Sequence, residues 1–132
     1  MILLLVIALF IGVFSAFSSS SLILPGTASL SEEVLAHTET IEKYAEKYEI
    51  EDYVAILQAI MMQESGGKGI DPIQASESGF NEKYPRVPNG ITDPEYSIEV
   101  GVKTFADCIK QAKVKDPTDT EGIYLALQGY TY

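Results

Sequence analysis

One apolar segment near the middle of the chain most restricts what the chain can fold into. From Tyr53 to Gln63 the residues are almost all apolar, and Ser65, Gly66 and Gly67 follow soon after. A run of this length without glycine or proline is typical of a helix that is apolar around most of its circumference, hence of a central helix. Gly66 or Gly67 can adopt the left-handed conformation that ends such a helix.

Glu64 is the one ionisable residue at the end of this run. Apolar surroundings and the negative end of the helix dipole both disfavour a carboxylate, so we expect a raised pKa for Glu64. A carboxyl group that stays protonated near neutral pH is what a general acid needs to protonate a leaving-group oxygen, as in a glycosidase. The position alone is equally compatible with a carboxylate that reaches solvent at a helix end.

The segment after Glu64 is long and polar. Residues 66–92 are rich in glycine, carboxylates, amides and hydroxyls and have little apolar periodicity. Connections between helices are usually much shorter, and long ordered loops often carry function. We therefore predict that this segment lines a polar groove.

The rest of the chain predicts an all-helical domain. Ser29 with Glu32 has the spacing of a capping box, and apolar residues recur at helical spacing from there to residue 48. The central helix is expected over about residues 52–65. Thr92 with Glu95 forms a second capping box before a helix that reaches residue 112 and should pack against the central one. A last helix should begin near residue 119 or 120.

The N-terminus predicts the compartment. Residues 2–24 are almost entirely apolar, and no charged side chain occurs before residue 32. Such a run serves as a secretory signal or approaches the length of a membrane span. We predict a signal peptide or membrane anchor with a short linker at residues 1–28, favouring an uncleaved anchor, and one folded domain at residues 29–132. The domain would then be extracytoplasmic and membrane-anchored, or alternatively secreted to the cell wall.

Composition excludes several functions. The chain has a formal net charge of −10, all of it in the predicted domain, which argues against binding to nucleic acid. A single cysteine, Cys108, excludes an internal disulfide and is interpreted as a small side chain beside the core. No cluster of metal ligands and no phosphate loop is present, so we predict no metal and no cofactor.

Three segments resemble the lysozyme-like muramidase domain of CwlT-type bacterial cell-wall hydrolases. They are residues 60–69, IMMQESGGKG, residues 71–78, DPIQASES, and residues 89–103, NGITDPEYSIEVGVK. Three motifs in order are far more specific than one Glu-Ser pair. The resemblance implies an all-α fold of the lysozyme superfamily, goose-type or lytic-transglycosylase-like. It also implies cleavage of the β-1,4 bond between N-acetylmuramic acid and N-acetylglucosamine.

The resemblance also implies roles for single residues. Glu64 would be the catalytic acid and Asp71 a second acid, which could steady an oxocarbenium-like transition state or orient water. From chemistry alone, Asp71 is equally an Asp-Pro turn starter. The expected substrate-binding residues are Ser65, Gln74, Ser76, Glu77 and Tyr130. Glu77 is also interpretable as a helix cap, and Tyr130 as a residue that stacks on sugar, holds Glu64 or belongs to the core.

Two departures from the family pattern leave alternatives open. The chain ends soon after Gly129-Tyr130, where the family continues with an asparagine, so the C-terminal part of the fold is expected to be truncated. The segment from 79 to 88 is longer than usual. Relatives are often joined to a cysteine peptidase domain in conjugative elements of Gram-positive bacteria, which implies local wall opening and secretion-apparatus proteins as partners. The alternatives are a lytic transglycosylase on the same bond and a non-catalytic anchored glycan-binding fragment.

Overall fold

The computed structural model describes residues 30–131, and all regular secondary structure in that part is helical. The elements are α3 (Glu32–Ala36), α4 (Thr38–Lys47), the 3₁₀ turn η1 (Glu51–Tyr53), α5 (Val54–Glu64), α6 (Pro94–Ala112) and α7 (Thr120–Thr131). No strand occurs among these residues, which confirms the prediction of an all-α domain. The leader at residues 1–28 and the membrane contact through residues 2–24 lie outside the described part.

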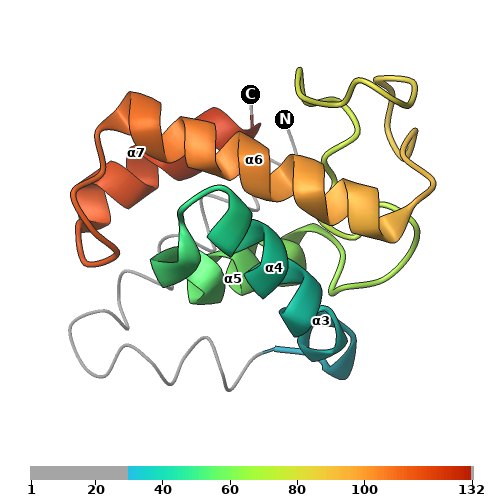
Figure 1. The fold of residues 1–132 in the computed structure, drawn as a ribbon, viewed down its shortest axis with the longest axis horizontal. Helices are drawn as coiled ribbons and strands as arrows, with labels where there is room; N and C mark the ends of the chain where they lie inside the picture. The colour runs from blue at the N-terminus through green and yellow to red at the C-terminus, as the bar shows by residue number, and fades with distance from the viewer. Residues whose placement is uncertain (1–29, 132) are drawn as a thin grey trace.

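The long helix α6 organises the domain. Figure 1 shows α7 along one half of α6, while α3, α4 and α5 lie on another side and the loop from α5 to α6 emerges at the far end. The main neighbours of α6 are α7 and α4, and its Phe105 ring meets Tyr53 and Tyr130 edge to face. In residues 30–131 no helix is both long and apolar enough to cross a membrane.

The central helix α5 is apolar as predicted and holds the core together. Its fully or nearly buried residues are Ile56, Leu57, Ala59, Ile60 and Met61. Burying one such large side chain contributes about 1.5–3 kcal/mol relative to exposing it. A helix this apolar is therefore fixed inside the domain, and its last residue is carried to the boundary of the core.

Two glycines end α5, as the sequence predicted. Gly66 and Gly67 both have left-handed φ angles, 69° and 84°. At Gly67 an added Cβ atom would also lie 2.5 Å from the backbone nitrogen of Val34, so α3 packs directly on the turn. Ser31 ties the two segments further, because its hydroxyl donates to the Gly66 carbonyl over 2.7 Å. The turn after Glu64 is thus held rigidly.

Local details differ from the predicted helix starts. The first helix is interrupted at His37 and forms α3 and α4. The N-cap of α3 is Ser31, whose hydroxyl accepts from the Val34 amide; Ser29 lies outside the described residues. For α6 the cap is Asp93, which accepts from the Glu95 amide, and not Thr92. Asp93 directly precedes Pro94 at the first helical position, where an extended residue with a short acceptor side chain is favoured.

Two equivalent sets of contacts join α4 to α6. In each, a glutamate of α6 accepts from a lysine and a tyrosine that are neighbours on α4. The sets are Lys43 and Tyr44 with Glu95, and Lys47 and Tyr48 with Glu99, over 2.6–2.9 Å. Their four-residue spacing on both helices fixes the alignment of α6 and hence of the residues that α6 presents to the loop.

Candidate active site

Glu64 lies in the last turn of α5 with its carboxyl group only partly accessible. Its Oε1 atom is buried and accepts or donates no hydrogen bond. Burial, as the larger cause, and the negative charge of Asp71 together raise the pKa of Glu64 from 4.5 to about 7. Burial therefore raises the pKa as the sequence predicted. The second cause is the neighbouring Asp71 carboxylate, whereas the sequence suggested the helix dipole.

This environment determines what Glu64 can do chemically. A carboxyl group with a pKa of about 7 carries its proton through most of the acidic and neutral range. No protein group bonds to its buried Oε1 atom, so the carboxyl proton is not committed to a partner inside the domain. Glycoside cleavage requires such an acid, because the leaving sugar departs as an alcohol only when it is protonated.

Asp71 has very different surroundings. Its side chain is only 1% exposed, and four groups donate hydrogen bonds to its carboxylate. The donors are the Ala75 amide and the Ser97 hydroxyl to Oδ1, and the Ser76 amide and hydroxyl to Oδ2, over 2.5–3.2 Å. An ionised carboxylate has about four acceptor sites, so this set leaves none for water or sugar.

The two residues after Asp71, Pro72 and Ile73, contact the end of α5 and the helices α6 and α7. The Ser65 hydroxyl, next to Glu64, donates to the Pro72 carbonyl over 2.5 Å. Tyr130 of α7 donates to the Ile73 carbonyl over 3.0 Å. Gly101 of α6 makes this approach possible, since a Cβ atom there would lie 2.4 Å from Ile73 and 3.0 Å from the Tyr130 hydroxyl.

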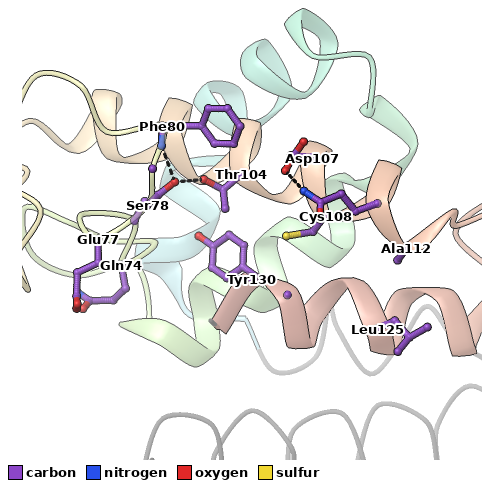
Figure 2. Close-up of a pocket in the computed structure, with 14 residues that line it drawn as sticks. Gln74, Glu77, Ser78, Phe80, Thr104, Asp107, Cys108, Ala112, Leu125 and Tyr130 are labelled. Atoms are coloured by element: carbon purple, nitrogen blue, oxygen red, sulfur yellow. Dashed lines mark hydrogen bonds between the residues drawn. The ribbon is translucent and has the colours of Figure 1, made fainter.

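A cavity of about 560 Å³ opens beside this segment, between residues 74–80, α6 and α7. Figure 2 shows Gln74, Glu77 and Ser78 on one wall, Tyr130 in the middle, and α6 residues along another wall. The Ser78 hydroxyl bonds to Thr104 over 2.7 Å and accepts from the Phe80 amide, which joins the loop to α6 at the rim. The size falls within the range of sites that bind small ligands.

Glu64 and Asp71 do not line the cavity, and Tyr130 is the lining residue that interacts electrostatically with both. Its ring lines the cavity, and the charges of Glu64 and Asp71 add to burial in raising the pKa of its hydroxyl. The Tyr130 hydroxyl donates to the Ile73 carbonyl and not to Glu64, so the predicted hydrogen bond to Glu64 is not formed. The ring makes an edge-to-face contact with the buried Phe105, as expected of a residue packed against the core.

The structure brings only some of the predicted binding residues to the cavity. Gln74, Glu77 and Tyr130 line it. Ser65 and Ser76 do not, because each hydroxyl is occupied within the loop: Ser65 also accepts from the Gly67 and Lys68 amides, and Ser76 accepts from Ile91. Both serines therefore shape the loop that carries the cavity wall.

Sequence reasoning missed the α6 wall of the cavity. Thr104, Asp107, Cys108 and Gln111 all line it, and their spacing of three and four residues places them on one helix face. That spacing was visible in the sequence, but nothing indicated which helix face meets the loop. Burial and the charge of Asp107 raise the pKa of Cys108 to about 11, which leaves this cysteine an unreactive wall residue. Within residues 30–131 no three His, Cys, Asp or Glu side chains gather to hold a metal ion.

Known proteins are similar to this chain in sequence and in fold. The chain is 41% identical over 106 residues to the bifunctional muramidase/DL-endopeptidase CwlT of Bacillus subtilis, covering 80% of the chain and 29% of that protein. It is 37% identical over 75 residues to the uncharacterised membrane protein YocA of Bacillus subtilis, covering 57% of the chain and 31% of that protein. The chain thus spans about a third of the length of these relatives, or less.

A solved structure from Staphylococcus aureus, described as similar to a lipoprotein of the NLP/P60 family, superimposes with a TM-score of 0.57. It is 45% identical in sequence, and the match covers 64% of this chain and 26% of that one. The family model described as lysozyme-like matches residues 31–132, which include Glu64, Asp71 and the whole cavity wall. The chain therefore belongs to the lysozyme-like family.

Proposed function

We propose that this protein is a peptidoglycan hydrolase that cleaves the β-1,4 bond between N-acetylmuramic acid and N-acetylglucosamine, with Glu64 as the general acid. The observation that carries the proposal is the buried, unpartnered Oε1 of Glu64 together with a pKa of about 7. The cell-wall activity in the name of the CwlT relative supports the choice of substrate.

The cavity supports a polymeric sugar substrate. Its walls carry amide, hydroxyl and carboxyl groups from Gln74, Ser78, Thr104 and Glu77, beside the Tyr130 ring. Polar groups of these kinds can bond sugar hydroxyl and acetamido groups, while an aromatic ring can cover an apolar sugar face. We assign substrate binding to Gln74, Glu77 and Tyr130, and assign Ser65 and Ser76 to holding the loop.

A second candidate function is lytic transglycosylation of the same bond. The observation that favours it is the set of four donors around Asp71, which leaves that carboxylate no free site to orient water. In transglycosylation one acid suffices, because the muramic 6-hydroxyl takes the place of water. If the protein is a hydrolase, water must instead reach the cation from the open side of the cavity.

Mass spectrometry of the products distinguishes the two reactions. We expect the purified protein to release fragments that end in a reducing N-acetylmuramic acid, because a relative 41% identical to this chain is named a muramidase. An internal 1,6-anhydro ring would make each fragment lighter by one water. A digest in which anhydro ends predominate would replace hydrolysis by transglycosylation and leave Glu64 as the acid.

We also propose that the domain works outside the cytoplasm, anchored through residues 2–24, and opens the wall locally for a conjugative or secretion system. The apolar N-terminal run and the membrane-protein relative support this location. A protease added to intact cells with a permeable wall should therefore remove the domain. Digestion that begins only after lysis would place the domain in the cytosol and contradict a role in the wall.

A further inference from the structure

We propose that Ser97 of α6 is a positioning residue: with Ser76 it fixes the Asp71 carboxylate inside the domain, so that Asp71 affects the reaction through Glu64 and not by contact with water or sugar. This inference rests on the proposed role of Glu64. It assigns a function to a serine that the sequence did not single out, and it narrows the role of Asp71.

Ser97 is fully buried, and its hydroxyl makes a long-range contact. A serine inside a helix commonly bonds the carbonyl one turn earlier. The Ser97 hydroxyl instead donates to Asp71 Oδ1 over 2.6 Å, across 26 residues of sequence. A buried carboxylate needs donors that offset its lost hydration, and bonds to a charged acceptor are stronger than neutral ones. Ser97 is the donor by which α6 holds this charge.

The remaining donors come from the loop itself, and they fix its path. Ser76 donates its amide and hydroxyl to Asp71 Oδ2, and the Ser76 hydroxyl accepts from the Ile91 amide over 2.9 Å. The two ends of the long loop therefore meet at Asp71. Ser97 anchors this junction to α6, whose alignment the α4 contacts determine.

The junction is mechanically and electrostatically coupled to Glu64. Mechanically, the Ser65 hydroxyl bonds to Pro72, which joins the residue after Glu64 to the residue after Asp71. Electrostatically, the Asp71 charge raises the pKa of Glu64, and the charge of Glu64 in turn raises the pKa of Tyr130 of α7. A displaced Asp71 would therefore change how readily Glu64 keeps its proton.

Titration of Glu64 by carbon-13 NMR tests this without any need for cleavage. We expect Asp71→Asn, which removes the charge of Asp71, to lower the midpoint of the Glu64 titration. Ser97→Ala keeps that charge but loses one of its anchors, so we expect it to shift the midpoint by less. In cleavage assays kcat/KM should be nearly retained at acidic pH. Above the midpoint kcat/KM should fall about tenfold for each unit by which the midpoint drops. Thr38→Ala is the matched control, because that partly buried hydroxyl bonds to Leu35 and Gln58 and makes no hydrogen bond to Asp71 or to the Asp71 donors.

Two results would overturn the inference. One is a Glu64 midpoint that stays at the parent value in folded Ser97→Ala and Asp71→Asn. The other is loss of cleavage at every pH in Asp71→Asn with an unchanged Glu64 midpoint, which would show that Asp71 acts on water or sugar. In Asp71→Asn the side-chain NH₂ group would face the backbone N–H of Ala75 or Ser76, and two donors cannot bond to each other. If this variant does not fold for that reason, the Glu64 titration in Ser97→Ala tests the inference. A parent protein that cleaves no glycan would contradict the proposed function but leave the titration result intact.

Discussion

Replacing Glu64 by glutamine is expected to lower the rate of glycan cleavage by a factor of about 10²–10⁴, the usual contribution of a general acid. Glutamine has nearly the same shape but no proton to give. Purified peptidoglycan, followed by release of soluble fragments, provides the assay. Glu42→Gln is the matched control, because Glu42 is an exposed residue of α4 away from the cavity. Cleavage by Glu64→Gln at the parent rate would show that another group supplies the proton.

The same substitution should change stability in a pH-dependent way, which verifies that the variant is folded. The Glu64 pKa is raised in the folded state, so its protonated form stabilises the fold fully below pH 4.5, and that stability is lost as pH rises towards 7. The shift corresponds to about 3 kcal/mol. Glutamine cannot ionise, so the free energy of unfolding of Glu64→Gln should exceed that of the parent more at pH 8 than at pH 4. An equal difference at both pH values would show that Glu64 titrates normally.

Local sequence signals were sufficient for the central and last helices and for the raised pKa of Glu64. The run from Tyr53 to Gln63 predicted a buried helix, and Gly66 and Gly67 predicted its left-handed end, because both depend on neighbours within one turn. The same holds for the helix that begins at Thr120. The helix start before Pro94 was predicted one residue early, since a threonine and an aspartate can both cap and only the geometry of the turn distinguishes them.

Hydrogen bonds between residues far apart in the sequence could not be predicted from such local signals. Ser97 and Asp71 are 26 residues apart, and Tyr130 and Ile73 are 57 apart. No local pattern indicates that they meet, because the meeting depends on how α6 and α7 pack. For the same reason the sequence suggested that Ser76 binds substrate, although its hydroxyl faces Asp71. The interior of a polar loop resembles a binding surface in sequence, since both use the same residue types.

The pH dependence of cleavage should follow the protonation of Glu64. With a pKa of about 7, kcat/KM should be almost independent of this group below pH 6 and fall tenfold per unit above pH 7. The sign follows from the role, because an acid is active in its protonated form. A glutamate with the ordinary value of 4.5 would already be about 99% ionised at pH 6.5, whereas Glu64 is then still mostly protonated. Cleavage at pH 9 should therefore be about a hundredfold slower than at pH 6.

The measurement is a pH–rate profile on soluble glycan fragments at constant ionic strength, with folding checked at each pH. Salt must be fixed because the chain carries ten excess negative charges, and its interaction with charged substrates depends on screening. A descending limb near pH 7 that also appears in the NMR titration of Glu64 would assign the limb to this residue. A limb near pH 4.5 would mean that Glu64 is solvated in the free enzyme and not buried, because kcat/KM reports the pKa values of the free enzyme. Since cleavage in a neutral cell wall requires the protonated acid, burial of Glu64 is the property on which the proposed activity most depends.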